Sequence, residues 1–179
     1  TAYDEDYICT VVNKKGEEIA EFDYINRYIN GYDVGYFAVS VDGKFGLVNK
    51  SAEWVIEPKY DKIHKDYDYN GCFHVEIDGK KGIINDKAEL IIEPKYDHIN
   101  YCGFSVGESK YEGYFTVVLN EKYGLFNING EQILEPIYDK ISCSNCFEIE
   151  LNGKYGLFDP KNEKTAELKY DNLQRIYDE

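Results

Sequence analysis

The cysteines are the first residues whose spacing could do chemistry. Cys143 and Cys146 stand three residues apart, which is the spacing of half a zinc site or of a redox-active pair. A zinc site of this kind needs a second such pair, and the sequence contains none. Cys146 and Cys72 each precede a phenylalanine, and tyrosines take the same place elsewhere, so we assign them a structural packing role. Because five cysteines cannot all pair, we predict reduced thiols in a cytoplasmic protein rather than a secreted disulfide framework.

The histidines and one acidic stretch do not form a metal-binding pattern. His64, His74 and His98 share no spacing that could seat zinc, and alternation places His74 at an exposed strand position. Residues 66–71, Asp-Tyr-Asp-Tyr-Asn-Gly, only faintly resemble a calcium-binding loop. We therefore predict no metal ion and no cofactor.

Carboxylates are abundant, but they recur in register along the chain. A general acid and a general base need two carboxyl groups in different environments, whereas residues repeated four times have similar environments. Glycine-rich phosphate loops and nucleophile-elbow motifs are also absent from the sequence. We therefore predict that these carboxylates shape turns and that the chain is not an enzyme. The aligned sets are Glu57, Glu93, Glu135 and Glu167, and Asp61, Asp97, Asp139 and Asp171.

These carboxylates belong to a repeat that organises the whole chain. The heptapeptide Glu-Pro-Lys-Tyr-Asp-Lys-Ile at 57–63 returns with small changes at 93–99, 135–141 and 167–173. A repeat of this period implies a unit that buries its apolar face only by stacking on its neighbours. We predict a single domain over residues 1–179, made of a partial repeat at 7–25 and full repeats at 37–63, 73–99, 115–141 and 147–173.

Each repeat predicts three short strands. In the first, residues 37–41 alternate with period two, and Asp42-Gly43 is a two-residue hairpin turn. The third repeat has Asn120-Glu121 instead, where we expect a different or strained turn, because glutamate rarely adopts left-handed backbone. Gly46 interrupts the second strand, and its recurrence predicts that neighbouring units press together there.

The heptapeptide predicts a corner that closes each repeat. Pro58 lacks a backbone donor, so the third strand, residues 54–56, should stop there. We expect Tyr60 to bury its ring, Asp61 to accept from backbone amides just ahead, and Ile63 to return to the core. The predicted fold class is all-β, with tandem β-meander or hairpin units stacked as an open twisted array. A closed five-bladed, propeller-like toroid is the alternative.

The sequence from Gly43 to Ile63 resembles the WG-containing, or KWG, β-repeat family of bacteria. The family pattern is Gly-x-Trp-Gly, two aliphatic residues, a turn, an apolar pair, Pro and Tyr-Asp, and four units between residues 37 and 173 resemble it, with Leu168 in place of Pro in the last. The tryptophan that names the family is replaced here. The resemblance implies an all-β, non-catalytic scaffold that binds other macromolecules, and it supplies no catalytic residues. The replacing residues are Phe45, Lys81, Tyr123 and Tyr155.

Charge and connectors indicate where binding would occur. A net charge of −14 disfavours nucleic acid and anionic membranes and attracts a basic protein, although acidity also serves solubility. The repeats have constant length but the connectors do not, so the connectors should emerge at one edge and specialise. Their tyrosines and acids could bind a partner or could pack beneath the loops. The candidate binding residues are Tyr32, Asp33, Asp66, Tyr67, Asp68, Tyr69, Tyr101, Phe104, Glu108, Tyr111 and Glu112.

Three functions are consistent with this pattern. The first is a monomeric binding module for a basic protein, such as an immunity protein or inhibitor that neutralises a cationic toxin or nuclease. The second is a surface or envelope module that binds glycan through aromatic connectors. The third is an uncharacterised hydrolase that uses Asp66 or Asp68.

Overall fold

The computed structural model describes residues 8–26, 35–65, 72–85, 87–102, 113–143, 147–159, 164–165 and 167–173. These residues form strands and turns, and none of them is helical. Two compact units divide the chain, residues 1–95 and 96–179. No helix within the described ranges is long and apolar enough to cross a membrane. The predicted all-β fold class is confirmed.

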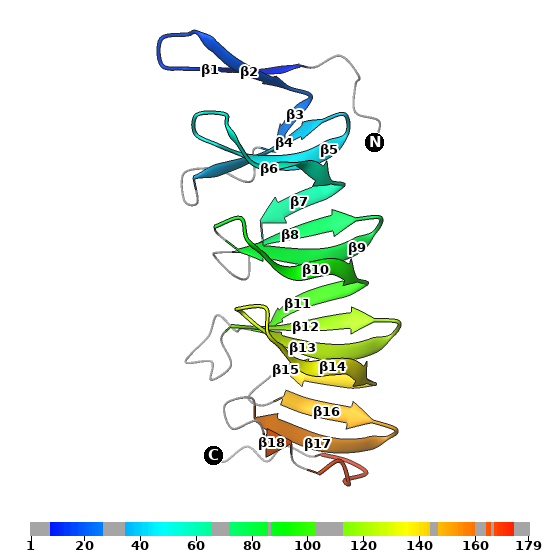
Figure 1. Cartoon of the computed structure of the whole chain (residues 1–179). Helices are drawn as coiled ribbons and strands as arrows, with labels where there is room; N and C mark the ends of the chain where they lie inside the picture. Colours follow the sequence, from blue (N-terminus) through cyan, green and yellow to red (C-terminus); the bar gives the residue numbers. More distant parts are fainter. Residues whose placement is uncertain are drawn as a thin grey trace, which may run out of the picture. The chain divides into compact units, whose positions relative to one another are not determined.

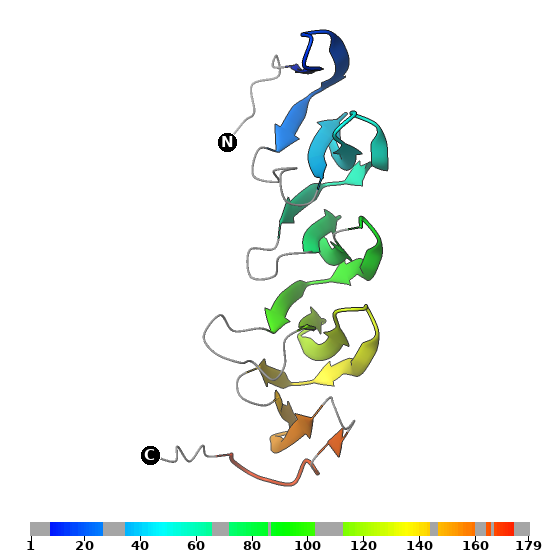
Figure 2. The same ribbon diagram turned by 90° about the vertical axis from the view of Figure 1, so that its left-hand side faces the viewer.

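The first unit contains a two-stranded sheet followed by two four-stranded sheets (Figure 1). Both larger sheets are antiparallel meanders of consecutive strands and are strongly twisted (Figure 2). The strands are β1 Cys9–Val12, β2 Glu18–Phe22, β3 Tyr24–Asn26, β4 Tyr36–Val41, β5 Lys44–Asn49, β6 Trp54–Tyr60, β7 Lys62–Lys65, β8 Cys72–Ile77, β9 Lys80–Asn85 and β10 Leu90–Tyr96.

The second unit contains two further four-stranded sheets of the same order. The last of them ends in a two-residue strand and an isolated bridge between Tyr155 and Tyr170. Its closing corner is therefore less regular than the others, as expected for a terminal repeat. The strands are β11 His98–Cys102, β12 Tyr114–Leu119, β13 Lys122–Asn127, β14 Gln132–Tyr138, β15 Lys140–Cys143, β16 Phe147–Leu151, β17 Lys154–Asp159 and β18 Lys164–Thr165.

Each sequence repeat contributes to two sheets. The residues after the Tyr-Asp corner do not return to their own sheet but become the first strand of the next, as β7 does beside β8. Among the described strands every sheet is open, and none closes into a barrel. Sheets that share a corner in this way form the open stacked array predicted from the repeat, within each unit.

The hydrophobic core lies between consecutive sheets. In the first unit, Leu47 of β5 and Tyr60 of β6 pack with Phe73 and Val75 of β8, and all four are at most 1% exposed. In the second, Leu125 of β13 belongs to the same cluster as residues of β16 and β17. Ile63, 2% exposed, returns to the core as predicted. Each sheet is therefore buried by its neighbour rather than by a common centre, as in other repeat arrays.

Gly46 marks a close approach inside its own sheet, which corrects the prediction of contact between units. A Cβ atom at Gly46 would lie 2.4 Å from the carbonyl oxygen of Ile56, on the neighbouring strand β6.

Strand β6 does not stop at Pro58, contrary to prediction, but continues to Tyr60. Phe45 pairs with Tyr60 and Leu47 with Ile56, so one residue of β5 faces three of β6. The proline sits in this bulge, where the ladder needs no donor.

The hairpin turns keep one geometry in all four repeats. Asp42 and Gly43 have φ of 51° and 71°, the left-handed pair of a two-residue turn. Asn120 and Glu121 have nearly the same values, 50° and 63°. The third turn therefore has the same geometry as the others but is strained. The strands on either side fix the shape of the turn, so Glu121 must adopt the left-handed backbone.

Candidate protein-binding edge

Within each unit, corner aspartates bind the hairpin turns at one edge of the sheets, the hairpin-tip edge, which carries the turns at 42–43, 78–79, 120–121 and 152–153. In the first unit, the Asp61 carboxylate pairs with the Lys44 ammonium of its own sheet. Its other oxygen accepts the Asp78 backbone amide, 2.7 Å away, from the hairpin turn of the following sheet. We predicted acceptance from amides just ahead, but the partner lies seventeen residues on. The side chain therefore holds two sheets together rather than one turn.

The second unit repeats this arrangement. The Asp97 carboxylate accepts the Asn120 amide at 2.9 Å, and Asp139 accepts the Asn152 amide at 2.6 Å. Asp139 also pairs with Lys122, and this hydrogen bond, followed by the Asn152 amide, holds the pKa of Asp139 below its ordinary value. Such carboxylates stay ionised and engaged, so their geometry suits structure and not proton transfer.

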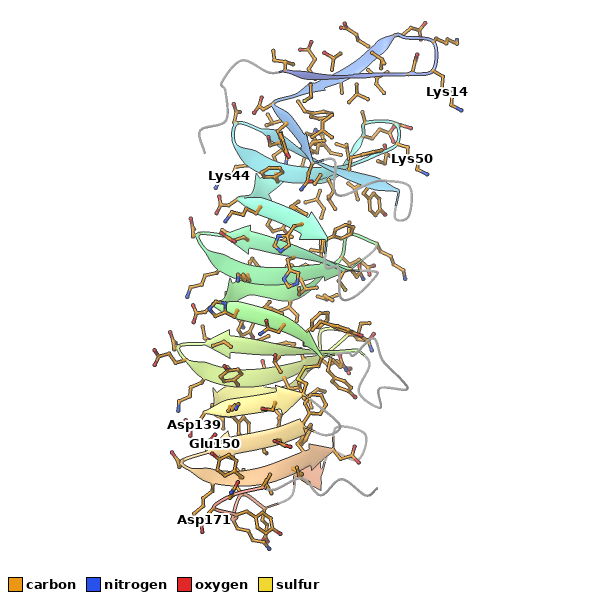
Figure 3. All side chains as sticks on the ribbon, turned by 180° about the vertical axis from the view of Figure 1, so that it is seen from behind. Lys14, Lys44, Lys50, Asp139, Glu150 and Asp171 are labelled. Carbon is orange, nitrogen blue, oxygen red and sulfur yellow. A yellow bond between two sulfur atoms is a disulfide. The ribbon has the colours of Figure 1, made fainter. Side chains whose placement is uncertain are left out.

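Further ion pairs balance the charge of the hairpin-tip edge. Lys62 and Glu76 pair across β7 and β8 at 2.9 Å. In the second unit, Asp139, Glu150 and Asp171 lie at one edge (Figure 3), and Lys154 pairs with Asp171. Glu150 accepts a hydrogen bond from Tyr155, which raises the pKa of that phenol. The acids Glu76, Asp139, Glu150 and Asp171 of this edge therefore have partners within the chain.

A second turn, predicted from stretches such as Asn127-Ile-Asn-Gly130, lies at the opposite edge of the sheets, and the asparagine that caps it was not predicted. Asn49 caps the turn from β5 to β6: its side-chain oxygen accepts the Ser51 and Glu53 amides at 2.8 and 3.0 Å, and its amide donates to the Glu53 carboxylate at 2.8 Å. The signal was an asparagine followed four residues later by a glutamate. It recurs at Asn13 and Glu17, Asn85 and Glu89, and Asn127 and Glu131.

The connectors begin and end beside these asparagine turns. Tyr36, which opens β4 after a connector, pairs with Asn49. Cys72 pairs with Asn85 and Tyr114 with Asn127 in the same way. Connector stems therefore lie at one edge of each sheet, as predicted, and Lys50 projects from this edge while Lys44 projects from the other (Figure 3).

Of the predicted binding residues, the structure describes Tyr101. It lies on β11 opposite Phe115, half-buried, with ring centroids 5.6 Å apart. Its hydroxyl accepts the Gly113 amide at 3.3 Å and so ties the two stems of one connector together. The others lie outside the described residues: Tyr32, Asp33, Asp66, Tyr67, Asp68, Tyr69, Phe104, Glu108, Tyr111 and Glu112.

A disulfide joins two connector stems in the second unit and corrects the prediction that all cysteines are reduced. Cys102 ends β11 and Cys143 ends β15, and their Cα atoms are 5.7 Å apart. The two lie 41 residues apart in sequence, so spacing could not pair them. They meet because β11 and β15 hold the same position in consecutive sheets. Cys9 and Cys72 form no disulfide, and Cys146 lies outside the described residues.

No site for a tightly held metal ion emerges from the described residues. Among them, no three His, Cys, Asp or Glu side chains gather closely enough to hold one. What the geometry provides is a constant framework with variable connectors at one edge.

Comparison with known proteins identifies this framework. The sequence model of one protein family, described as WG containing repeat, matches residues 45–80, 82–123 and 123–155. No curated protein matches the chain. The matched ranges begin in strands β5, β9 and β13, and each contains one corner and the first strand of the next sheet. The chain therefore belongs to the family of proteins with WG-containing repeats.

Proposed function

We propose that this chain is a non-catalytic binding module whose connectors engage a basic protein. The observation that carries the proposal is the placement of the connector stems. In three sheets the strand that follows a connector begins beside an asparagine turn at one edge, as at Tyr36 and Asn49. A rigid repeat that presents segments of varied length and sequence from one edge is an arrangement suited to recognition.

Charge supports a basic partner. The chain carries a net charge of −14, which attracts cationic surfaces over a distance of about 8–10 Å at moderate ionic strength. At the hairpin-tip edge, the corner aspartates are neutralised by lysines and backbone amides. The connector acids Asp33, Asp66, Asp68, Glu108 and Glu112 stand among tyrosines, the residue type most often found with tryptophan and arginine at binding hot spots.

Within this class, we propose an inhibitor or immunity protein that neutralises a cationic toxin, such as a nuclease. Small size, acidity and the absence of catalytic motifs from the sequence support this role. The repeated corner carboxylates also support it, because they are engaged in structure and leave no acid–base pair at that edge.

Photo-crosslinking from the two edges tests the binding edge. A photoreactive residue placed at Tyr67 or Tyr111 should link the chain to one basic protein in its source cells. The same residue at Asp42, on a hairpin tip, should not. The linked protein is then purified and titrated with the chain at several salt concentrations.

Paired charge changes test the chemistry. The double variant Asp66→Asn, Asp68→Asn should weaken binding about three- to tenfold and reduce its salt dependence. Asp42→Asn with Asp78→Asn removes the same charge from two exposed hairpin tips, where asparagine tolerates the left-handed backbone, and should change affinity less than about twofold. If both double variants weakened binding equally, net charge alone would explain the effect, and the proposal that the partner binds at the connector edge would be refuted. Links to an acidic protein, or binding to glycan alone, would refute the proposed partner.

A further inference from the structure

Two histidines that share no repeat position lie side by side on one sheet of the first unit. His64 on β7 stands directly opposite His74 on β8 in the strand register. Their imidazole rings stack with centroids 5.0 Å apart and planes only 4° from parallel. His64 is exposed and His74 half-buried, so the pair lies at the surface of the sheet.

We propose that His64 and His74 together bind a divalent transition-metal ion such as Zn²⁺, Ni²⁺ or Cu²⁺. Neutral imidazole is the commonest protein ligand for these ions. With a metal–nitrogen bond of about 2.0–2.1 Å and an imidazole radius of about 1.1 Å, two rings on one tetrahedral ion have centroids about 5.2 Å apart. The observed 5.0 Å already matches that separation.

Chelation needs a change of ring orientation and not of backbone. Parallel rings direct their nitrogen lone pairs along parallel lines, so the rings must tilt toward each other to converge on one ion. The torsion that tilts a histidine ring is soft and broadly populated, so the tilt has a small energetic cost. The strand register already holds the two Cα atoms in place, so only the side chains must move for both histidines to bind one ion.

The surroundings of the pair favour an exchangeable ion. Two rungs along the same two strands, and on the same face, lies the Lys62–Glu76 ion pair, whose Glu76 is two residues from His74. The carboxylate of Glu76 compensates the Lys62 ammonium, which would otherwise repel a cation. Among the described residues, no group of three His, Cys, Asp or Glu side chains that could hold an ion includes the two histidines. Two histidine ligands hold an ion less firmly than the four ligands of a closed structural zinc site, so the ion should exchange.

The test measures binding of Ni²⁺ and Zn²⁺ by calorimetry to the full chain in a Cys9→Ser background, which removes a half-exposed thiol from competition. His64→Gln and His74→Gln should each weaken binding by about tenfold or more, the scale on which metal affinity responds to changes around a site. The double variant should be little worse than either single variant, because losing one ligand already destroys the chelate. His98→Gln is the matched control, since His98 stands on β11 opposite Val118 and not opposite an imidazole.

Two further measurements separate coordination from misfolding. Paramagnetic Ni²⁺ should broaden the imidazole resonances of His64 and His74 before that of His98. Saturating Zn²⁺ should raise the unfolding midpoint of the Cys9→Ser protein and its His98→Gln variant but not that of His64→Gln. Failure of the Cys9→Ser protein to bind either ion, or equal loss of binding in the His98→Gln control, would overturn the proposal. Its outcome is independent of the identity of any protein partner.

Discussion

Alanine in place of the repeated strand glycine should destabilise the protein in an order set by the structure. A Cβ atom would lie 2.4 Å from the Ile56 carbonyl oxygen at Gly46, 2.5 Å from that of Ile92 at Gly82, but 2.9 Å from that of Leu134 at Gly124. Real Cβ atoms essentially never approach closer than 3.0 Å, and backbone carbonyls cannot rotate away as side chains can. The strands must therefore separate by roughly half an ångström in the first two repeats and by only about a tenth in the third.

These displacements set the magnitudes. Overpacking of a close contact costs about 1–3 kcal/mol, and the loss of glycine entropy from the unfolded chain returns about 0.4–1 kcal/mol. We therefore expect Gly82→Ala to lower the free energy of unfolding by about 2 kcal/mol or more, and Gly124→Ala by about 1 kcal/mol or less. Gly46→Ala should resemble Gly82→Ala.

Urea unfolding followed by circular dichroism gives the stability change, and hydrogen exchange shows which sheet opens. Protection should fall in β5–β6 for Gly46→Ala and in β9–β10 for Gly82→Ala. The control is Thr10→Ala, because Thr10 pairs with Glu21 in the regular part of β1–β2, before the register shift between Val11 and Val12, and neither strand contains a glycine. If Gly124→Ala proved as costly as Gly82→Ala, or if all three variants fell within 0.5 kcal/mol of the wild type, the close approach would not be the reason for these glycines.

Three other outcomes follow from the structure. Glu121→Gly should raise the free energy of unfolding by about 1 kcal/mol in a urea titration, because φ is 63° at this position, and no gain would show that the strain is absent. Thiol titration of the denatured protein should find two fewer reactive thiols before reduction than the five found after it, on account of the Cys102–Cys143 bond; five thiols before reduction would contradict the disulfide. The pKa values of Asp61 and Asp139 are lowered by their lysine and amide partners, so their stabilisation is complete above about pH 4 and is lost as pH falls further. When both aspartates are replaced with asparagine, the free energy of unfolding should fall less steeply as the pH drops below about 4. An unchanged pH dependence would mean that these carboxylates are not linked to folding.

The repeat carried most of the fold prediction because it is local. The period of the heptapeptide, the Asp42-Gly43 turn and the strand expected at residues 37–41 are properties of neighbouring residues, and all reappear in the structure. The burial of β4 does not alternate, because Ala38, Val39 and Ser40 are all buried. The contacts that a residue makes with another strand or another sheet could not be predicted from neighbouring residues. Asp61 binds an amide of the next sheet, and Gly46 approaches the strand beside it. A sequence reveals that a residue recurs, but the backbone geometry decides what it touches.

The site prediction was limited by the same distinction. Cys102 and Cys143 are 41 residues apart and were predicted to be reduced, yet they meet because their strands hold equivalent places in consecutive sheets. His64 and His74 share no repeat position, yet they face each other because the corner residues become the first strand of the following sheet. Comparing aligned repeat positions finds residues with equal roles. It does not find residues from different positions that the shared sheet brings together.

The corner aspartates also indicate how cooperativity passes from sheet to sheet within a unit. Asp61 and Asp139 each contact a lysine of their own sheet and a turn of the next, and their side chains are 30% and 31% exposed. Asp171 pairs with Lys154 but is 87% exposed, and no following turn covers it among the described residues. An ion pair of that exposure contributes little by itself, whereas a carboxylate that joins two sheets couples their stabilities. Loss of Asp139 should therefore weaken the coupling between the last sheet and its neighbour more than loss of Asp171 would, because only Asp139 makes a contact that both sheets share.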